Sequence, residues 1–174
     1  MRILALTALA LLGCNNAGLP ASPPTGDTQS GLYQVTVETN ADDCTPPAVA
    51  GDAGTTLLSR AASGIEVGIP EGPGFARYDL AARSNFAFDG SRPLQGCPAN
   101  AVREALQLLS DQNDTLQVSA IEDWTVNAPC APDALETAPA QTCHADRTIT
   151  YRFLTACTNP VRVNVDFSGH VTCD

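Results

Sequence analysis

Histidines and paired carboxylates are the side chains of this chain that could carry out acid–base chemistry. The histidines are His144 and His170, and the adjacent carboxylates are Asp42–Asp43 and Glu122–Asp123. Covalent hydrolysis needs a nucleophile held beside a base, and no Gly-x-Ser-x-Gly segment supplies one. A carboxylate pair acts as acid and base only where burial raises one of the two pKa values. We assign no catalytic residue and expect a protein that is not an enzyme.

Glu122 is the most unusual of these carboxylates, because it interrupts the apolar face formed by Leu116, Val118, Ala120 and Trp124. A charged group on the buried face of a strand costs free energy unless it is paired. An edge position or a β-bulge would let the side chain of Glu122 face the solvent instead. We expect one of these two arrangements.

Three hard oxygen ligands of the kind that calcium binds fall in one short segment, at Asp111, Asn113 and Asp114. The residue spacing and the glycine of an EF-hand loop are absent from this segment. We therefore expect neither a metal site nor a cofactor.

Cysteine offers clearer chemistry, because the chain contains seven cysteines. An odd number in an exported protein normally leaves one thiol over. The chain contains no Cys-x-x-Cys pair, the spacing that would indicate a zinc site. If Cys14 has a separate role, the remaining cysteines indicate three disulfides, one of fifteen possible connectivities. These disulfide cysteines are Cys44, Cys97, Cys130, Cys143, Cys157 and Cys173.

The pairing can be argued from the segments around the cysteines. Cys130 and Cys143 bracket a proline-rich loop that has few core-forming side chains, so a bond between them would hold a segment that packing cannot. Cys157 and Cys173 both lie on the inward face of predicted strands, and a bond between them would prevent fraying of the terminus. The favoured map is Cys130–Cys143, Cys157–Cys173 and Cys44–Cys97, and the alternative joins Cys157 to Cys44 and Cys97 to Cys173.

Alternation of apolar and polar residues with period two predicts strands through most of the chain. The first strand begins at Gly31, with Tyr33, Val35 and Val37 on its inward face. Two late segments, 149–157 and 161–167, flank a three-residue turn and predict a β-hairpin. The other predicted strands cover residues 56–58, 65–69, 75–80, 86–88, 116–126 and 171–173.

Residues 98–110 fit two structures. Val102, Ala105, Leu106 and Leu109 have helical spacing, and Asn100 could cap such a helix. Alternatively, the segments 106–108 and 116–118 flank a turn-rich stretch and would form a hairpin. We favour the hairpin because the neighbouring elements are strands, and strands need partners.

These patterns predict an all-β fold of about eight strands, because alternation of this kind excludes a parallel α/β sheet. The architecture is an antiparallel sandwich or a partly closed barrel, stapled by disulfides and allowing one short helix. We assign residues 31–174 to this domain. Residues 14–30 are rich in proline and glycine, so we expect a flexible tether there.

Charge excludes one class of partner. The net charge is −10, and all nine cationic residues are arginine. Nucleic acid is not expected as a partner, because phosphate binding needs a basic face. Anionic lipid headgroups are disfavoured for the same reason.

The start of the chain resembles the lipobox of bacterial lipoproteins. Arg2 precedes an apolar run from Ile3 to Leu12, which is typical of a secretory signal and too short to span a bilayer. The segment Leu11-Leu12-Gly13-Cys14 then matches the lipobox pattern. The resemblance implies that residues 1–13 are removed and that Cys14 becomes a lipidated N-terminus. The alternative is an ordinary signal cleaved near Ala17.

The mature chain resembles the small predicted lipoproteins that are abundant in myxobacteria. The likeness consists of the lipobox, a Pro/Gly/Thr tether, a Gly-x-Tyr-x-Val-x-Val strand, an Asp-Asp-Cys turn and a late Tyr-x-Phe strand ending in cysteine. It implies a protein exported and lipid-anchored to the cell envelope, with the outer membrane as the commoner site. It implies no activity.

Two functions follow from these expectations. The first is a non-catalytic structural or protein-binding β domain, with the membrane and other envelope proteins as partners. The second is a lipocalin-like carrier of a small apolar ligand. Its cavity would be lined by Tyr33, Phe75, Trp124, Tyr151, Phe153 and Phe167.

The lipobox predicts the covalent state of Cys14. We expect the mature protein to begin at Cys14, to carry acyl chains and to partition into detergent, because several chains at about 0.8 kcal/mol per buried CH₂ anchor a protein stably. Intact-mass spectrometry of the purified protein measures this directly. A soluble product with an unmodified Cys14 would contradict the prediction.

Overall fold

The computed structural model describes residues 28–47, 50–71, 74–131, 138–157, 163–165 and 171–173. Among them, no helix is long and apolar enough to cross a bilayer. The elements are β1 (Gly31–Asp42), β2 (Gly51–Ala61), β3 (Gly64–Glu71), β4 (Gly74–Ala81), the 3-10 turn η1 (Ala82–Ser84), β5 (Ala87–Leu94), β6 (Cys97–Gln112), β7 (Thr115–Thr125), β8 (Cys143–Ala156), β9 (Val163–Val165) and β10 (Val171–Cys173).

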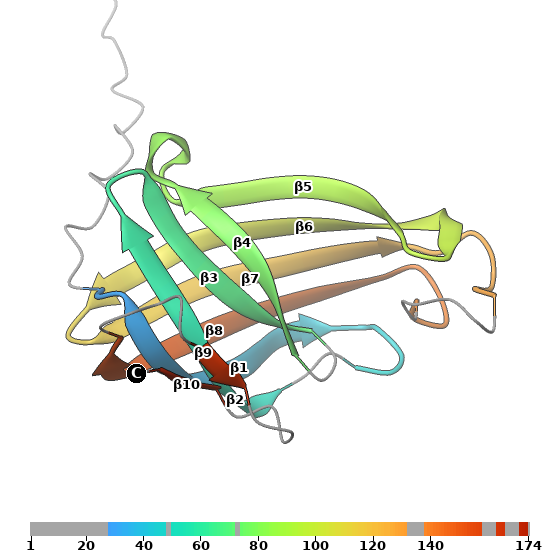
Figure 1. The fold of residues 1–174 in the computed structure, drawn as a ribbon. Helices are drawn as coiled ribbons and strands as arrows, with labels where there is room; N and C mark the ends of the chain where they lie inside the picture. Colours follow the sequence, from blue (N-terminus) through green and yellow to red (C-terminus); the bar gives the residue numbers. More distant parts are fainter. Residues whose placement is uncertain are drawn as a thin grey trace, which may run out of the picture.

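Strands β1 to β8 form one antiparallel sheet that closes into a barrel, in the order of the sequence (Figure 1). Strands β9 and β10 form a separate two-stranded sheet. The predicted all-β fold of about eight antiparallel strands is therefore confirmed. Of the two predicted architectures, the barrel is the one observed.

Inward-facing residues of neighbouring strands meet in layers inside the barrel. Val35 lies opposite Tyr151, which in turn lies opposite Leu116, and all three are fully buried. The hydroxyl of Tyr151 crosses the interior to donate a hydrogen bond of 2.9 Å to the carbonyl of Gly68 on β3. Side chains from opposite walls thus fill this half of the barrel, as expected for a close-packed core.

The favoured hairpin is confirmed, and residues 98–110 lie within strand β6. Gln112 pairs with Thr115, so β6 and β7 are joined by the two-residue turn of Asn113 and Asp114. Both turn residues have left-handed backbone, with φ of 52° and 59°. A type I′ turn requires this conformation, and its twist matches that of the paired strands. Asn100 therefore does not cap a helix.

The predicted hairpin between 149–157 and 161–167 is wrong. Strand β8 pairs with β7 on one edge and with β1 on the other. Ring closure uses both edges of β8 over residues 145–152, which leaves no room for a third strand beside those residues. Strand β9 pairs with β10 instead, with Val165 opposite Val171.

Two disulfides differ from the favoured map. Cys44 is bonded to Cys143, with a Cα–Cα distance of 5.0 Å, and Cys97 is bonded to Cys130, at 5.1 Å. The predicted bonds Cys130–Cys143 and Cys44–Cys97 are therefore wrong. Cys157 is also disulfide-bonded. Its predicted partner, Cys173, has a side chain outside the described residues, so that bond stays a prediction.

Strand pairing explains the first of the two observed bonds, and the side chain of Asn100 explains the second. The pairing of β1 with β8 places Asp42 opposite Ala145, which brings the ends of the two strands together at Cys44 and Cys143. Asn100 on β6 is buried, and its side chain accepts hydrogen bonds from the backbone N–H groups of residues 127 and 128, at 2.9 and 3.1 Å. This contact holds the segment after β7 against the start of β6, where Cys130 reaches Cys97.

Residues preceding β1 bind to the barrel. The backbone N–H and the hydroxyl of Thr28 both donate to the buried carboxylate of Asp111, which also forms an ion pair with Arg60. The hydroxyl of Tyr33 donates to the carbonyl of Gln29 at 2.8 Å. Residues 28 to 30 were expected to belong to the flexible tether. They are instead held against the end of the barrel that carries the β6–β7 turn.

We predict that loss of the Cys44–Cys143 bond destabilises the fold more than loss of Cys97–Cys130. The bonds join residues separated by 99 and 33 positions. In the chain-entropy model, loops of these lengths give about 5 and about 4 kcal/mol. Equilibrium urea unfolding of Cys44→Ala/Cys143→Ala and Cys97→Ala/Cys130→Ala provides the comparison. The reverse order of stability would contradict the prediction.

Candidate functional site

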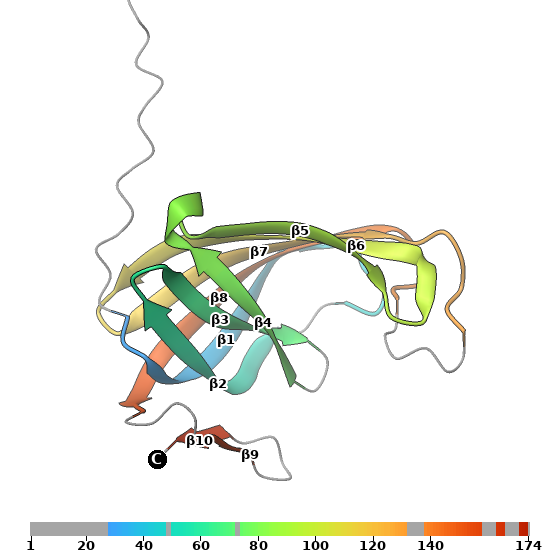
Figure 2. The ribbon, with the colours of Figure 1, turned by 45° about the horizontal axis from the view of Figure 1, so that its top comes forward.

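The barrel wall opens between β4 and β5. Among the described residues, these two strands pair at a single position, Ala81 with Ala87, whereas β4 pairs with β3 and β5 with β6 along their lengths. The connection includes η1 and two residues with left-handed backbone, Asn85 and Phe86. From this point β4 and β5 diverge, as both ribbon views show (Figures 1 and 2). The two strands thus form the sides of an opening.

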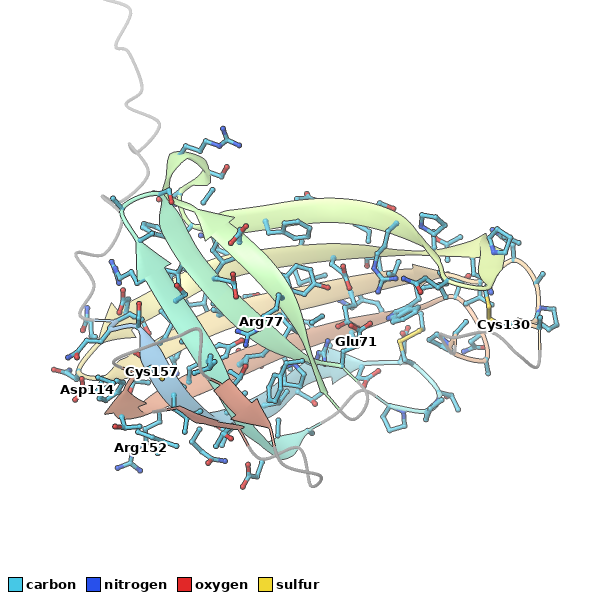
Figure 3. All side chains as sticks on the ribbon, viewed as in Figure 1. Glu71, Arg77, Asp114, Cys130, Arg152 and Cys157 are labelled. Atoms are coloured by element: carbon cyan, nitrogen blue, oxygen red, sulfur yellow. A yellow bond between two sulfur atoms is a disulfide. The ribbon has the colours of Figure 1, made fainter. Side chains whose placement is uncertain are left out.

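A cleft of about 550 Å³ occupies this opening. Its apolar lining comes from Ala76 on β4 and Phe88 on β5. Figure 3 shows Glu71 and Arg77 on the β3–β4 wall. The polar lining consists of Glu71, Arg77, Tyr78, Asp79, Arg92, Gln95 and Glu104. Polar side chains from four consecutive strands and the β5–β6 turn therefore converge on one space.

Ion pairs cross the floor of the cleft. The guanidinium of Arg92 lies 3.2 Å from a carboxylate oxygen of Glu71 and 3.9 Å from one of Glu104. Tyr78 is hydrogen-bonded to Glu104, and burial together with this bond raises the pKa of Tyr78 well above its usual value. Tyr78 is therefore a neutral phenol that donates to Glu104. Its ring packs edge-to-face against Phe88, with centroids 5.1 Å apart.

A second ion pair lies deeper, behind Glu104. Glu104 faces Glu122 across the β6–β7 pairing, and Glu122 forms an ion pair with Arg147, whose side chain is 2 % exposed. Trp124 donates its indole N–H to Glu122 at 3.2 Å. Burial lowers the pKa of Arg147, against the opposing effect of negative charges on Asp42 and Glu104. Charged groups thus continue from the cleft into the barrel interior.

The prediction that Glu122 faces the solvent is wrong. Its side chain points inward because Arg147 on the neighbouring strand compensates its charge. A buried carboxylate without such a partner would be strongly destabilising. Arg147 has the same parity as Ile149 and Tyr151, so it interrupts an apolar face just as Glu122 does. The sequence therefore contained a sign that these two charges form a pair. Only the register of β7 against β8 shows that these two residues meet.

The other candidate acid–base residues lie outside the barrel. His144 and Asp123 are on the outer face, where Nδ1 of His144 lies 2.7 Å from Asp123. This hydrogen bond raises the pKa of His144. Arg103 lies 3.5 Å from Asp123 and binds Asp89 through two hydrogen bonds. Because neighbouring strand residues point to opposite faces, Glu122 and Asp123 do not form a site together.

Asp42, Asp43 and His170 complete the predicted acid–base set. One carboxylate oxygen of Asp42 accepts a hydrogen bond of 2.8 Å from the backbone N–H of Cys44. Asp43 accepts one of 2.5 Å from the backbone N–H of His144 on the outer face. His170 lies outside the described residues. The carboxylates of Asp42 and Asp43 are thus each engaged by backbone N–H groups.

Potential metal ligands are engaged in other interactions. Asp43, Cys44 and Cys143 lie within 4.8 Å of one another, but the two sulfur atoms are joined in a disulfide and cannot act as thiolate ligands. The carboxylate of Asp111 is bound to Thr28 and Arg60. The three oxygen ligands considered for calcium, Asp111, Asn113 and Asp114, are thus divided between a buried ion pair and the β6–β7 turn.

The aromatic residues expected to line an apolar cavity do not line this cleft. Tyr33 and Tyr151 belong to the packed core. Phe153 packs against Tyr33, with ring centroids 5.4 Å apart. Phe75 and Trp124 are partly buried against core residues, and Phe167 lies outside the described residues. Sequence reasoning also missed Glu71, Tyr78, Arg92 and Glu104, because nothing in their spacing indicated that β4 and β5 separate.

Comparison with known proteins gives no match to a family model, to a curated protein or to a solved structure. Function must therefore be argued from the cleft and its chemistry.

We predict strong coupling between Arg147 and Glu122. Arg147→Met leaves Glu122 without its partner, so the free energy of unfolding should fall by about 3 kcal/mol or more. The double variant Arg147→Met/Glu122→Gln should recover part of this loss, because it removes both charges. Equilibrium unfolding followed by the fluorescence of Trp124, the single tryptophan, measures all variants.

The matched control is Arg152→Met on the same strand, because Arg152 is exposed. We expect it to change stability by less than about 0.5 kcal/mol. The single variant Glu122→Gln completes the set. If the losses in free energy of unfolding caused by Arg147→Met and Glu122→Gln simply add in the double variant, the predicted coupling is contradicted.

Proposed function

We propose that this chain is an exported, lipid-anchored, non-catalytic binding protein whose β-barrel takes a small hydrophilic ligand in the cleft between β4 and β5. The observation that carries the proposal is the cleft itself, a space of about 550 Å³ on which polar groups from several strands converge. Small-molecule sites typically occupy roughly 300–1,000 Å³ and orient their ligands through a few convergent polar groups. The cleft has both properties.

The lining argues for a hydrophilic ligand. An apolar ligand would cover Glu71, Arg92 and Glu104 without replacing their hydration, which costs free energy for each polar group. In the apolar half of the barrel, the hydrogen bond from the hydroxyl of Tyr151 to the backbone carbonyl of Gly68 shows that a side chain spans the interior. The structure thus favours a polar ligand over the apolar one expected of a lipocalin-like carrier.

The proposed anchor is compatible with this site. The lipobox resemblance would attach the chain to the membrane at Cys14, and the chain is fastened to the barrel again at Thr28 through Asp111. That contact lies at the end of the barrel with the β6–β7 turn, whereas the cleft opens through the side wall between β4 and β5. The membrane is thus the proposed partner through acyl chains, and nucleic acid is not a proposed partner at a net charge of −10.

A fragment-binding experiment tests the proposed site. Amide chemical shifts of the full chain in detergent are recorded with a set of hydrophilic fragments and a set of apolar fragments. We expect hydrophilic fragments to perturb residues 76–79, Phe88 and Arg92 most strongly, since these residues line the cleft. Perturbations caused by apolar fragments alone, or confined to other surfaces, would contradict the proposal.

A cleft-filling variant provides the control. Ala76→Trp places a large ring in the cleft and should abolish the perturbations, because Ala76 is part of the lining. Leu154→Trp introduces the same side chain at a position that is 50 % exposed on β8, and should leave them unchanged. Equal effects of the two substitutions would show that binding occurs elsewhere.

A further inference from the structure

Most of the charges that line the cleft already take part in ion pairs. Arg92 lies between Glu71 and Glu104. Arg77 lies 3.6 Å from Glu66 and also donates to the carbonyl of Leu57. An anion or a cation entering the cleft would therefore meet charges of both signs and compete with existing ion pairs. A neutral ligand does not have this cost.

The same groups offer hydrogen bonds of both kinds at close spacing. Ionised carboxylates such as Glu71 and Glu104 only accept, whereas guanidiniums such as Arg92 only donate. Tyr78 donates its proton to Glu104 and keeps its oxygen lone pairs as acceptors. Adjacent hydroxyls of a polyhydroxylated molecule can donate to the carboxylates and accept from the guanidinium at once. Such a molecule matches the pattern without carrying a charge.

An aromatic pair adds an apolar surface. Tyr78 and Phe88 come from the two strands that form the sides of the opening, and their planes are inclined at 65°. In this edge-to-face geometry, the edge-on ring has both faces uncovered by its partner. The C–H face of a sugar ring is apolar and flat enough to lie on an aromatic ring, while its hydroxyls point outward to polar side chains.

A buried donor lies near the cleft. Nε of Arg147 makes no hydrogen bond within the described part of the chain, although the side chain is 2 % exposed. The charge of Glu104 and the phenol of Tyr78 both influence the pKa of Arg147, so its guanidinium lies near two residues of the cleft lining. Buried donors are normally satisfied. A ligand hydroxyl, or a water between it and Arg147, would satisfy this one.

We infer that the ligand of the cleft is a neutral saccharide, an inference that rests on the proposed function. Tyr78 with Phe88 provides the stacking surface, and Glu71, Arg92 and Glu104 bind the hydroxyls. The ligand class is thus an uncharged ring that carries hydroxyl groups and has an apolar face.

A matched set of sugars tests the class. A panel of neutral mono- and disaccharides that includes glucose, maltose and diacetylchitobiose is titrated calorimetrically into the full chain in detergent. Glucosamine and glucuronate then compare the same ring with a positive and a negative charge. We expect at least one neutral sugar to bind with an affinity that changes little between low and high salt. Each charged analogue should bind about tenfold more weakly.

Variants connect binding to the cleft. Tyr78→Ala removes the stacking ring and a hydrogen-bonding group, so the affinity for the bound neutral sugar should fall about tenfold or more. Arg152→Ala, at an exposed position on β8, should not change it. Ala76→Trp should abolish binding by filling the cleft.

The outcomes separate the two proposals. Tighter binding of a charged analogue, strong salt dependence, or no saccharide binding while hydrophilic fragments still perturb residues 76–79 would overturn the saccharide class alone. Saccharide binding unaffected by Ala76→Trp would overturn the assignment to the cleft. If neither sugars nor hydrophilic fragments respond to Ala76→Trp, the proposed function itself fails.

Discussion

The pairing of β1 with β8 is the constraint on which the rest of the structure depends. It joins segments more than a hundred residues apart, from Gly31 with Ala156 to Asp42 with Ala145. Closure at this seam turns an open sheet into a ring and brings Cys44 beside Cys143. It also places Arg147 inside the barrel, where Glu122 must compensate its charge. Most of β8 is paired on both edges, and the C-terminal strands β9 and β10 form a sheet of their own.

The ring is closed unequally. The β1–β8 seam is paired along its length and fastened by a disulfide, whereas among the described residues β4 meets β5 only at Ala81 and Ala87. Because of this difference, the interior has an apolar part and a charged part. Where the wall is continuous, apolar residues such as Val35 and Leu116 are fully buried. Where it opens, charged groups such as Arg92 remain in contact with solvent and can be tolerated.

The polar half is organised as paired charges and not as isolated ones. Arg92 and Arg147 each face carboxylates, and Glu104 lies between the two ion pairs. Ion pairs of this kind contribute little net stability, because desolvation offsets much of their attraction. They lie on the inner wall next to the aromatic pair of Tyr78 and Phe88, where they can form hydrogen bonds with a ligand. This is the physical basis of the proposed hydrophilic ligand.

The sequence by itself determined the class of fold, because alternation with period two is a local property: Tyr33, Val35 and Val37 identify a half-buried strand without reference to any partner. A turn between the segments 106–108 and 116–118 was predicted for the same reason, whereas its two-residue form at Asn113 and Asp114 was not. The disulfide pairing, the inward direction of Glu122 and the cleft between β4 and β5 were decided only by the tertiary structure. Each depends on which strand lies beside which and in what register, and that is set by contacts between distant residues that no local pattern encodes.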